Sequence, residues 1–249
     1  MTKRKEYTLA GRKIFIALPA YDHKVSIKLA ISLARLAQMV GEHGVNIAIG
    51  SICGCSVVSK ARNLLADEFL STDCTDLLFI DADINFEPED VLRLLAWTTN
   101  YGIAAGVPRT RKKNGNYIIT LDEDEDHSLV TDDMGCAKAK RVATAFMMVQ
   151  RKVFETLRDA HPEWKYHDTN SGKTLTAFFD FKVTPEGYIG EDYLFCDRTR
   201  EHGFEVWVDP TIKLGHMGVI EYEGDFGRDA IYTKKAVQSE FPPAMSDVA

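Results

Sequence analysis

The stretch Leu77-Leu78-Phe79-Ile80-Asp81-Ala82-Asp83 decides the fold that this sequence is expected to adopt. Four consecutive apolar residues between polar neighbours are typical of a strand that is buried on both faces in a parallel sheet. Ligands gather at the carboxyl ends of such strands, which is where Asp81 and Asp83 stand. Residues two apart in an extended segment point to the same side, so both carboxylates can face one point. Two such carboxylates suit a hard divalent cation.

Strands and helices are expected to alternate on both sides of this stretch. Before it, the apolar pattern predicts strands over residues 13–18 and 45–49, a helix that ends near Val40, and a second helix over 57–70. After it, we expect a helix from Pro88 to Trp97 and a strand over 102–107. Alternation of this kind implies right-handed crossovers. The sequence therefore predicts an α/β fold with a mostly parallel central sheet.

The second half of the sequence has a less regular pattern. It predicts a short strand over 117–121, one strand over 141–150, a helix over 151–158, a loop-rich aromatic region over 161–189, a helix over 190–201 and a strand over 204–208. The five acids at 122–126 are interpreted as a solvated loop. We predict a single domain over 1–225, with a nucleotide-binding half at 12–110, an acceptor-binding half at 111–225 and a C-terminal tail at 226–249.

The composition is that of an ordinary globular protein. The chain has 249 residues and a formal net charge of −7, so no global basic field recruits nucleic acid or anionic membrane. Its apolar runs are too short to span a bilayer and no signal peptide is evident, so a cytoplasmic location is expected. The five cysteines are odd in number and match no zinc spacing, and we interpret them as reduced thiols.

Several short motifs occur in order along the chain, namely Asp81-Ala82-Asp83, Glu191-Asp192, Gly203 with Asp209-Pro210, and His216. In their order, spacing and strand contexts they resemble the GT-A glycosyltransferases, in particular the family-2-like enzymes. The resemblance covers most of residues 13–218. It implies a Rossmann-like nucleotide-diphospho-sugar transferase that moves a sugar from a nucleoside diphosphate to an acceptor hydroxyl in a metal-dependent reaction.

The resemblance implies a metal site made by Asp81, Asp83 and His216. In the family the D-x-D acids hold Mn²⁺ or Mg²⁺, with Asp83 as the direct ligand and Asp81 on the ribose or on the metal through water. The ion neutralises the charge that develops on the leaving diphosphate. An imidazole ligand favours Mn²⁺ over Mg²⁺. The alternative is that His216 is a buried structural histidine.

The resemblance also implies that Asp192 is the catalytic base and that Glu191 helps to bind the acceptor. A base within hydrogen-bond reach raises the nucleophilicity of the attacking hydroxyl. Direct displacement with inversion is preferred, because a well-placed Asp192 permits it. The alternative is that these acids only begin a helix, where negative charge is favourable.

Donor binding is expected in the loop after the first strand and beside it. The base and ribose would be held by Pro19, Tyr21 and Asp22, together with Asp81 and Ala82. The ring of Tyr21 would stack on the base, and the carboxylate of Asp22 would accept a hydrogen bond from it. Arg62 matches a position that meets base or phosphate. The alternatives are that Tyr21 is a surface aromatic residue, that Asp22 is a helix N-cap and that Arg62 is a solvated helix charge. Uridine is preferred only weakly, since Ser51 stands where many relatives carry an acid.

The acceptor is expected to be a glycan or another hydroxyl compound. The basic cluster at 109–113 is either a solvated loop or a phosphate contact, and an acceptor that bears phosphate, including DNA with a hydroxylated base, would exploit it. The resemblance places the acceptor site near a group of aromatic residues, which are otherwise core residues: Trp164, Tyr166, Phe178, Phe179 and Tyr188.

Two other functions are consistent with parts of the sequence. The D-x-D strand also resembles the first motif of haloacid-dehalogenase-type phosphatases, in which Asp81 would be the nucleophile and Asp132-Asp133 would mimic the later acid pair. The third possibility is a GT-A-like module that binds a nucleotide or glycan without catalysis.

Overall fold

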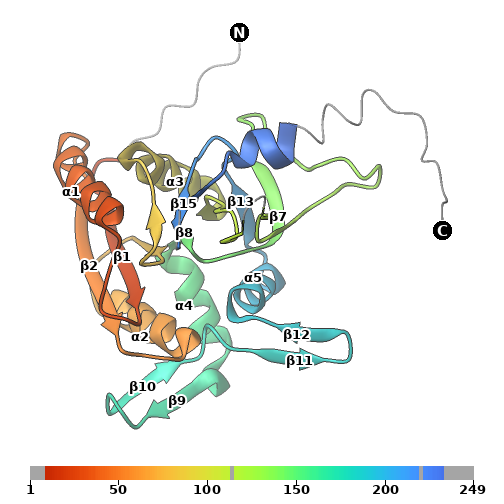
Figure 1. Cartoon of the computed structure of the whole chain (residues 1–249). Coiled ribbons are helices and arrows are strands. Elements are labelled where there is room, and N and C mark those ends of the chain that lie inside the picture. The colour runs from red at the N-terminus through yellow and green to blue at the C-terminus, as the bar shows by residue number, and fades with distance from the viewer. Residues whose placement is uncertain (1–8, 113–114, 219–220, 233–249) are drawn as a thin grey trace.

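The protein, described here as a computed structural model over residues 9–112, 115–218 and 221–232, has an α/β fold around one large sheet (Figure 1). The sheet has the strand order β2 (Asn46–Cys53), β1 (Lys13–Ala20), β3 (Asp76–Ile80), β8 (Phe146–Gln150), β5 (Gly102–Ala105), β13 (Glu205–Val208), β7 (Ala137–Val142), β6 (Ile119–Leu121). Six of these strands run in one direction, and β8 and β7 run in the other. The predicted mostly parallel α/β sheet is confirmed.

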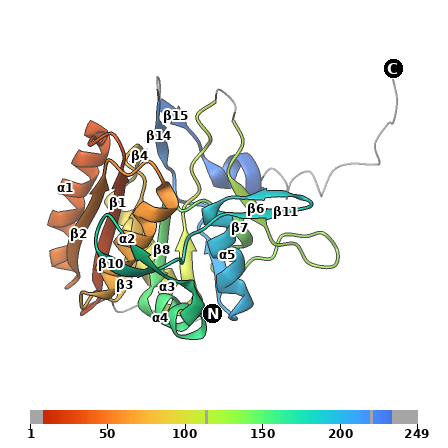
Figure 2. The ribbon, with the colours of Figure 1, turned by 90° about the horizontal axis from the view of Figure 1, so that it is seen from below.

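Helices cover both faces of the sheet, as Figures 1 and 2 show. On one face α1 (Ile27–Glu42) and α3 (Pro88–Tyr101) contribute to a common core. On the other face the core is made with α2 (Val58–Leu70), α4 (Arg151–Ala160) and α5 (Glu191–Glu201). The described helices include none with the length and apolarity needed to cross a bilayer.

Smaller elements surround the sheet. A three-stranded sheet joins β4 (Ile84–Asn85), β14 (Gly215–Met217) and β15 (Glu221–Glu223), and two hairpins pair β9 (Lys165–Asp168) with β10 (Lys173–Thr176) and β11 (Lys182–Thr184) with β12 (Gly187–Ile189). A 3₁₀ turn, η1, spans Pro162–Trp164, and a π-helix, η2, spans Gly227–Tyr232. The β11–β12 hairpin projects from the body of the molecule just before α5 (Figure 2).

Strand β3 shows why the D-x-D stretch lies at the centre of the sheet. Its side chains alternate between the two cores: Leu77 and Phe79 join the α2 side, whereas Leu78 and Ile80 join the α1 side. Since both faces are covered, every position of the strand must be buried, and the alternation of polar and apolar residues disappears. The strand thus carries Asp81 and Asp83 directly out of the core.

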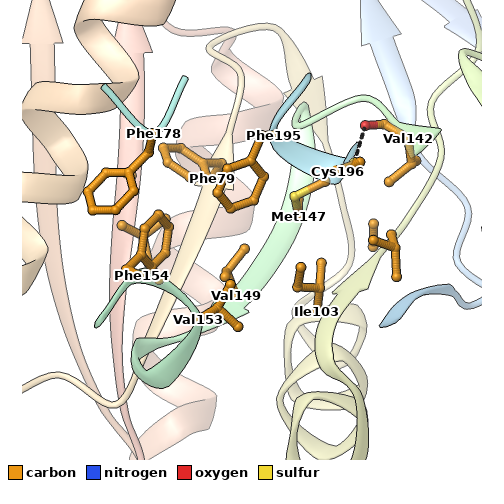
Figure 3. Close-up of a cluster of buried hydrophobic side chains, with 14 of the residues drawn as sticks. Phe79, Ile103, Val142, Met147, Val149, Val153, Phe154, Phe178, Phe195 and Cys196 are labelled. Atoms are coloured by element: carbon orange, nitrogen blue, oxygen red, sulfur yellow. Dashed lines mark hydrogen bonds between the residues drawn. The ribbon is translucent and has the colours of Figure 1, made fainter. Parts of the chain in front are cut away.

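A cluster of aromatic rings connects helix α5 to strand β3 (Figure 3). Phe179 packs edge-on against Phe79, with ring centroids 5.2 Å apart, and stacks on Phe195 at 4.4 Å. Phe195 in turn stacks on Phe154 of α4 at 5.6 Å. Offset and edge-to-face pairs of this kind add to the free energy gained by burial. The cluster therefore fixes the start of α5 relative to the end of β3.

Replacing Phe195 by Ala is expected to lower the free energy of unfolding by about 3–5 kcal/mol, because the fully buried ring leaves a cavity among its neighbours. Urea denaturation measures the loss. Tyr188→Ala on the exposed β11–β12 hairpin is the matched control and is expected to change stability by less than about 1 kcal/mol. A similarly small change for Phe195→Ala would contradict the packing described here.

Three predictions of local structure are corrected. The single strand over 141–150 is two strands, β7 and β8, separated by a turn at 143–145, because they occupy different places in the sheet. The region over 161–189 forms two hairpins rather than loops. The tail was expected to begin at 226, but Phe226 and Ile231 are buried in the core. Residues 233–249 lie outside the described residues.

Candidate functional site

The D-x-D turn at the end of β3 is held by backbone hydrogen bonds from three segments. The amide of Asp81 donates to Ala145 at 3.0 Å and the amide of Met217 donates to the carbonyl of Asp83 at 2.8 Å. Ser26, which caps α1 with its hydroxyl, donates its own amide to Ala82 at 3.1 Å. Strand β14, the N-terminus of α1 and the 143–145 turn therefore fix the position of both carboxylates.

A cleft of about 630 Å³ opens beside this turn. It is lined by most of the residues predicted for donor binding and for the cation: Pro19, Tyr21, Asp22, Asp81, Ala82 and Asp83. The Tyr21 ring is 65% exposed, so its face is available for stacking. The N-terminus of α2 also lines the cleft through Val58, and no side chain caps that helix. The predicted donor residues thus share one cleft, with the exception of Arg62.

His216 lies beside Asp83, with Nε2 3.6 Å from the carboxylate. Strand pairing of β14 with β4 brings it there, because His216 stands opposite Ile84. Its Nδ1 is 2.7 Å from the carbonyl oxygen of Arg109, which can only accept, so Nδ1 carries the proton and Nε2 has the lone pair. Burial lowers the pKa of His216, which favours the neutral ring. This is the form in which histidine binds a metal.

Two of the three predicted metal ligands therefore face each other. Within the described ranges, however, no three acidic, histidine or cysteine side chains converge as a complete metal site. Asp81 accepts a hydrogen bond from Arg62 at 3.2 Å. The guanidinium of Arg111 lies between the other two, donating to Asp83 and, at 2.9 Å, to His216 Nε2. The donor chemistry fits a cation, with two protein ligands and further ligands to come from elsewhere.

Arg62 connects the D-x-D turn to helix α5. Its guanidinium contacts both Asp81 and Glu191, and the residue is only 4% exposed. Its Nε–H is buried without an acceptor among the described residues. The sequence prediction placed Arg62 against a base or phosphate, or in solvent. In this structure it instead pairs with two carboxylates that are far apart in sequence.

Asp192 stands in the first turn of α5, next to Glu191. Its carboxylate accepts a hydrogen bond from the amide of Tyr193 at 2.8 Å. Burial and the neighbouring charge of Glu191 raise the pKa of Asp192 above the ordinary aspartate value. A half-buried carboxyl with a raised pKa is a suitable general base. Glu191, in contrast, is already paired with Arg62.

Of the residues predicted for the acceptor, Trp164, Tyr166 and Phe179 line one pocket of about 460 Å³, and the other two lie elsewhere. Phe178 and Phe179 are buried in the core. The ring of Trp164 stacks on that of His161, with centroids 3.8 Å apart, and Cζ of Arg198 lies 4.1 Å from the Trp164 ring centroid. Tyr188 is exposed on the projecting hairpin. The alternative that these aromatic residues are core residues therefore holds for Phe178 and Phe179, because their buried rings pack in the core shared with α5 and the sheet.

Asp132 and Asp133, the acid pair expected for a phosphatase, lie away from the cleft that contains Asp81. Asp132 accepts hydrogen bonds from the hydroxyl of Tyr101 and from the amides of Met134 and Cys136 in its own turn. Neither Asp132 nor Asp133 lines the cleft that contains Asp81. The structure thus offers no support for a phosphatase site built on these residues.

No protein-family model matches the sequence, and the curated proteins include no match either. The solved structures that are similar include the following three. GalNAc-T7 with UDP, GalNAc and Mn²⁺ is 10% identical, with a TM-score of 0.46 over 83% of this chain and 44% of that one. S. aureus TarS 1–349 is 13% identical, with a TM-score of 0.43 over 79% and 58%.

The third structure is 4-diphosphocytidyl-2C-methyl-D-erythritol synthase from Anaerococcus prevotii, 12% identical with a TM-score of 0.42 over 92% of this chain and 99% of that chain. The first two proteins are GT-A glycosyltransferases and the third is a nucleotidyltransferase. The chain spans about half the length of the first two, 44% and 58%. At these TM-scores the backbones coincide only in part.

Proposed function

We propose that this protein transfers a sugar from a nucleoside diphosphate to an acceptor hydroxyl. One observation carries the proposal: Asp83 and His216 face one cation position beside a large cleft, and the guanidinium of Arg62 connects the adjacent Asp81 to Glu191, the residue before Asp192 in the first turn of α5. A cation position beside a candidate base is the arrangement that glycosyl transfer from a diphosphate requires.

The charges around the site support a divalent cation, with Mn²⁺ preferred. The guanidinium of Arg62 is shared by the carboxylates of Asp81 and Glu191, the guanidinium of Arg111 pairs with Asp83, and Asp192 adds a fourth carboxyl next to Glu191. A divalent ion on Asp83 and His216 would supply Lewis acidity toward the diphosphate. Nitrogen with oxygen ligands suits Mn²⁺ better than Mg²⁺.

The protein's own residues then divide the work. Tyr21 and Asp22 hold the nucleoside in the cleft, and a UDP-linked donor is preferred on the sequence resemblance. Asp192 accepts the proton of the acceptor hydroxyl while oxygen attacks the anomeric carbon, and the nucleoside diphosphate leaves from the opposite face. Such direct displacement inverts the configuration. Arg62 pairs with Glu191, the neighbour of the base.

A screen of nucleotide-sugars tests the proposal. A ligand that binds only the folded chain raises its melting temperature, so the cognate donor is expected to stabilise the protein more with Mn²⁺ than without it. Hydrolysis or transfer of that donor is then followed by release of the nucleoside diphosphate. Absence of both stabilisation and turnover with every common nucleotide-sugar would favour a non-catalytic module or another reaction.

The rate of transfer is expected to fall as the pH decreases, over a range above the ordinary aspartate pKa of about 3.9. The base must be ionised, and the raised pKa of Asp192 keeps it protonated at pH values where an exposed aspartate is ionised. A profile of kcat/KM against pH measures this limb. If the residual activity of Asp192→Asn showed the same fall in kcat/KM at low pH, this fall would have to be assigned to another titrating group.

A further inference from the structure

Arg111 occupies the position between the two predicted metal ligands. It donates from Nε to His216 Nε2 at 2.9 Å and forms an ion pair with Asp83. The proton on Nδ1 of His216 leaves only a lone pair on Nε2, which faces the carboxylate at 3.6 Å. Two hydrogen-bond acceptors that face each other repel unless a hydrogen-bond donor or a cation lies between them. In this structure that group is a guanidinium.

The loop that carries Arg111 is anchored at its base. Arg109 is paired with Asp229 of η2, and the hydroxyl of Tyr117 donates to the same carboxylate at 2.9 Å. The amide of Thr110 donates to the carbonyl of Asn116 at 2.9 Å and closes the loop. These contacts hold both ends of the loop against the C-terminal part of the chain that is described.

The side chain of Arg111 is free to leave. It is 53% exposed, whereas Asp83 and His216 are 24% and 13% exposed. Ion pairs with an exposed partner contribute little to stability, so releasing this guanidinium costs little. Asp83 and His216 therefore form a fixed site, and the guanidinium of Arg111 is the group that another cation can replace.

We propose that Arg111 is a built-in substitute for the divalent cation, so that the guanidinium and the metal ion exclude each other at Asp83 and His216. The inference rests on the cation site used in the proposed function and adds a regulatory feature to it. Without metal, Arg111 balances the charge of the D-x-D turn. A divalent ion must displace it, which weakens metal binding by the apo protein.

Titration of the full chain with Mn²⁺ alone, without nucleotide, tests the proposal by calorimetry. Arg111→Met is expected to bind Mn²⁺ about tenfold more tightly than wild type, because a competing positive charge is removed from its ligands. Lys112→Met is the matched control: it removes the same charge from the neighbouring, exposed position. Its affinity for Mn²⁺ is expected to stay within about twofold of wild type.

Adding Asp83→Asn to Arg111→Met is expected to abolish the gain in Mn²⁺ affinity. Unchanged Mn²⁺ affinity in Arg111→Met, or an equal gain in Lys112→Met, would overturn the proposal. Arg111→Gln serves as a second variant, with melting curves to verify folding of each protein. Since no donor is present, these results stand apart from the proposed function: failure of every nucleotide-sugar to react would leave the competition between Arg111 and Mn²⁺ intact.

Discussion

Replacing Asp192 by Asn is expected to lower kcat for sugar transfer by about 10²–10⁴-fold while donor affinity changes little. The variant keeps the size of the side chain and an oxygen that can accept from the amide of Tyr193. It removes the only function that the proposal assigns to this residue, which is to take a proton. Initial rates and donor binding, measured separately, distinguish loss of the base from loss of the site.

Asp180→Asn is the control for this substitution. Asp180 is an exposed aspartate just before the β11–β12 hairpin and takes no part in the cleft, so its variant is expected to keep wild-type rates. Wild-type kcat in Asp192→Asn would remove the residue from the mechanism. A large rise in the donor dissociation constant would instead indicate that Asp192 helps to form the donor site.

Of the two adjacent acids, the structure favours Asp192 as the base. Glu191 is ion-paired with Arg62, so its carboxylate already has a partner before any acceptor substrate arrives. Asp192 has a raised pKa and only one short hydrogen bond from a neighbouring amide among the contacts described. The sequence could not separate the two, because a helix start with two consecutive acids has the same pattern in either case.

The sequence predicted the parts of the fold that depend on local pattern. The apolar run of β3 and the acids that follow it are sufficient to place a D-x-D turn at the carboxyl end of a buried inner strand. The turn at 143–145 was missed because Ala143-Thr144-Ala145 contains neither Gly nor Pro, and the apolar pattern continues through it. Strand order then decides that β7 and β8 are separate, and strand order is not a local property.

The contacts that assemble the site are also not local. Arg62 and Glu191 are 129 positions apart, and Arg111 meets His216 across 105 positions. A sequence shows that such charges exist but not which of them pair. Phe179 illustrates the opposite error: an aromatic residue in a predicted loop suggested a sugar-binding surface, whereas the hydrogen bonds of its backbone with the Asn63 side chain, 2.9 Å each, hold it in the core.

Replacing Arg62 by Met is expected to lower the free energy of unfolding by about 3–5 kcal/mol and to abolish transfer. The side chain is almost completely buried between Asp81 and Glu191. Met fills a similar volume but leaves the carboxylates of Asp81 and Glu191, which are 31% and 13% exposed, without their counter-charge. Loss of one partner of a buried ion pair costs more than the pair contributes, because the remaining charge stays desolvated.

A double-mutant cycle separates this charge effect from a loss of packing. If the cost comes from unpaired carboxylates, Glu191→Gln in the Arg62→Met background is expected to recover at least about 1 kcal/mol, although Glu191→Gln alone is destabilising. Urea denaturation of the four proteins measures the coupling. Additive effects would mean that Arg62 acts through its aliphatic part. The structural role of Arg62 would then be ordinary packing in α2, and the link between the D-x-D turn and the base would have to be sought in the aromatic contact of Phe79 with Phe179.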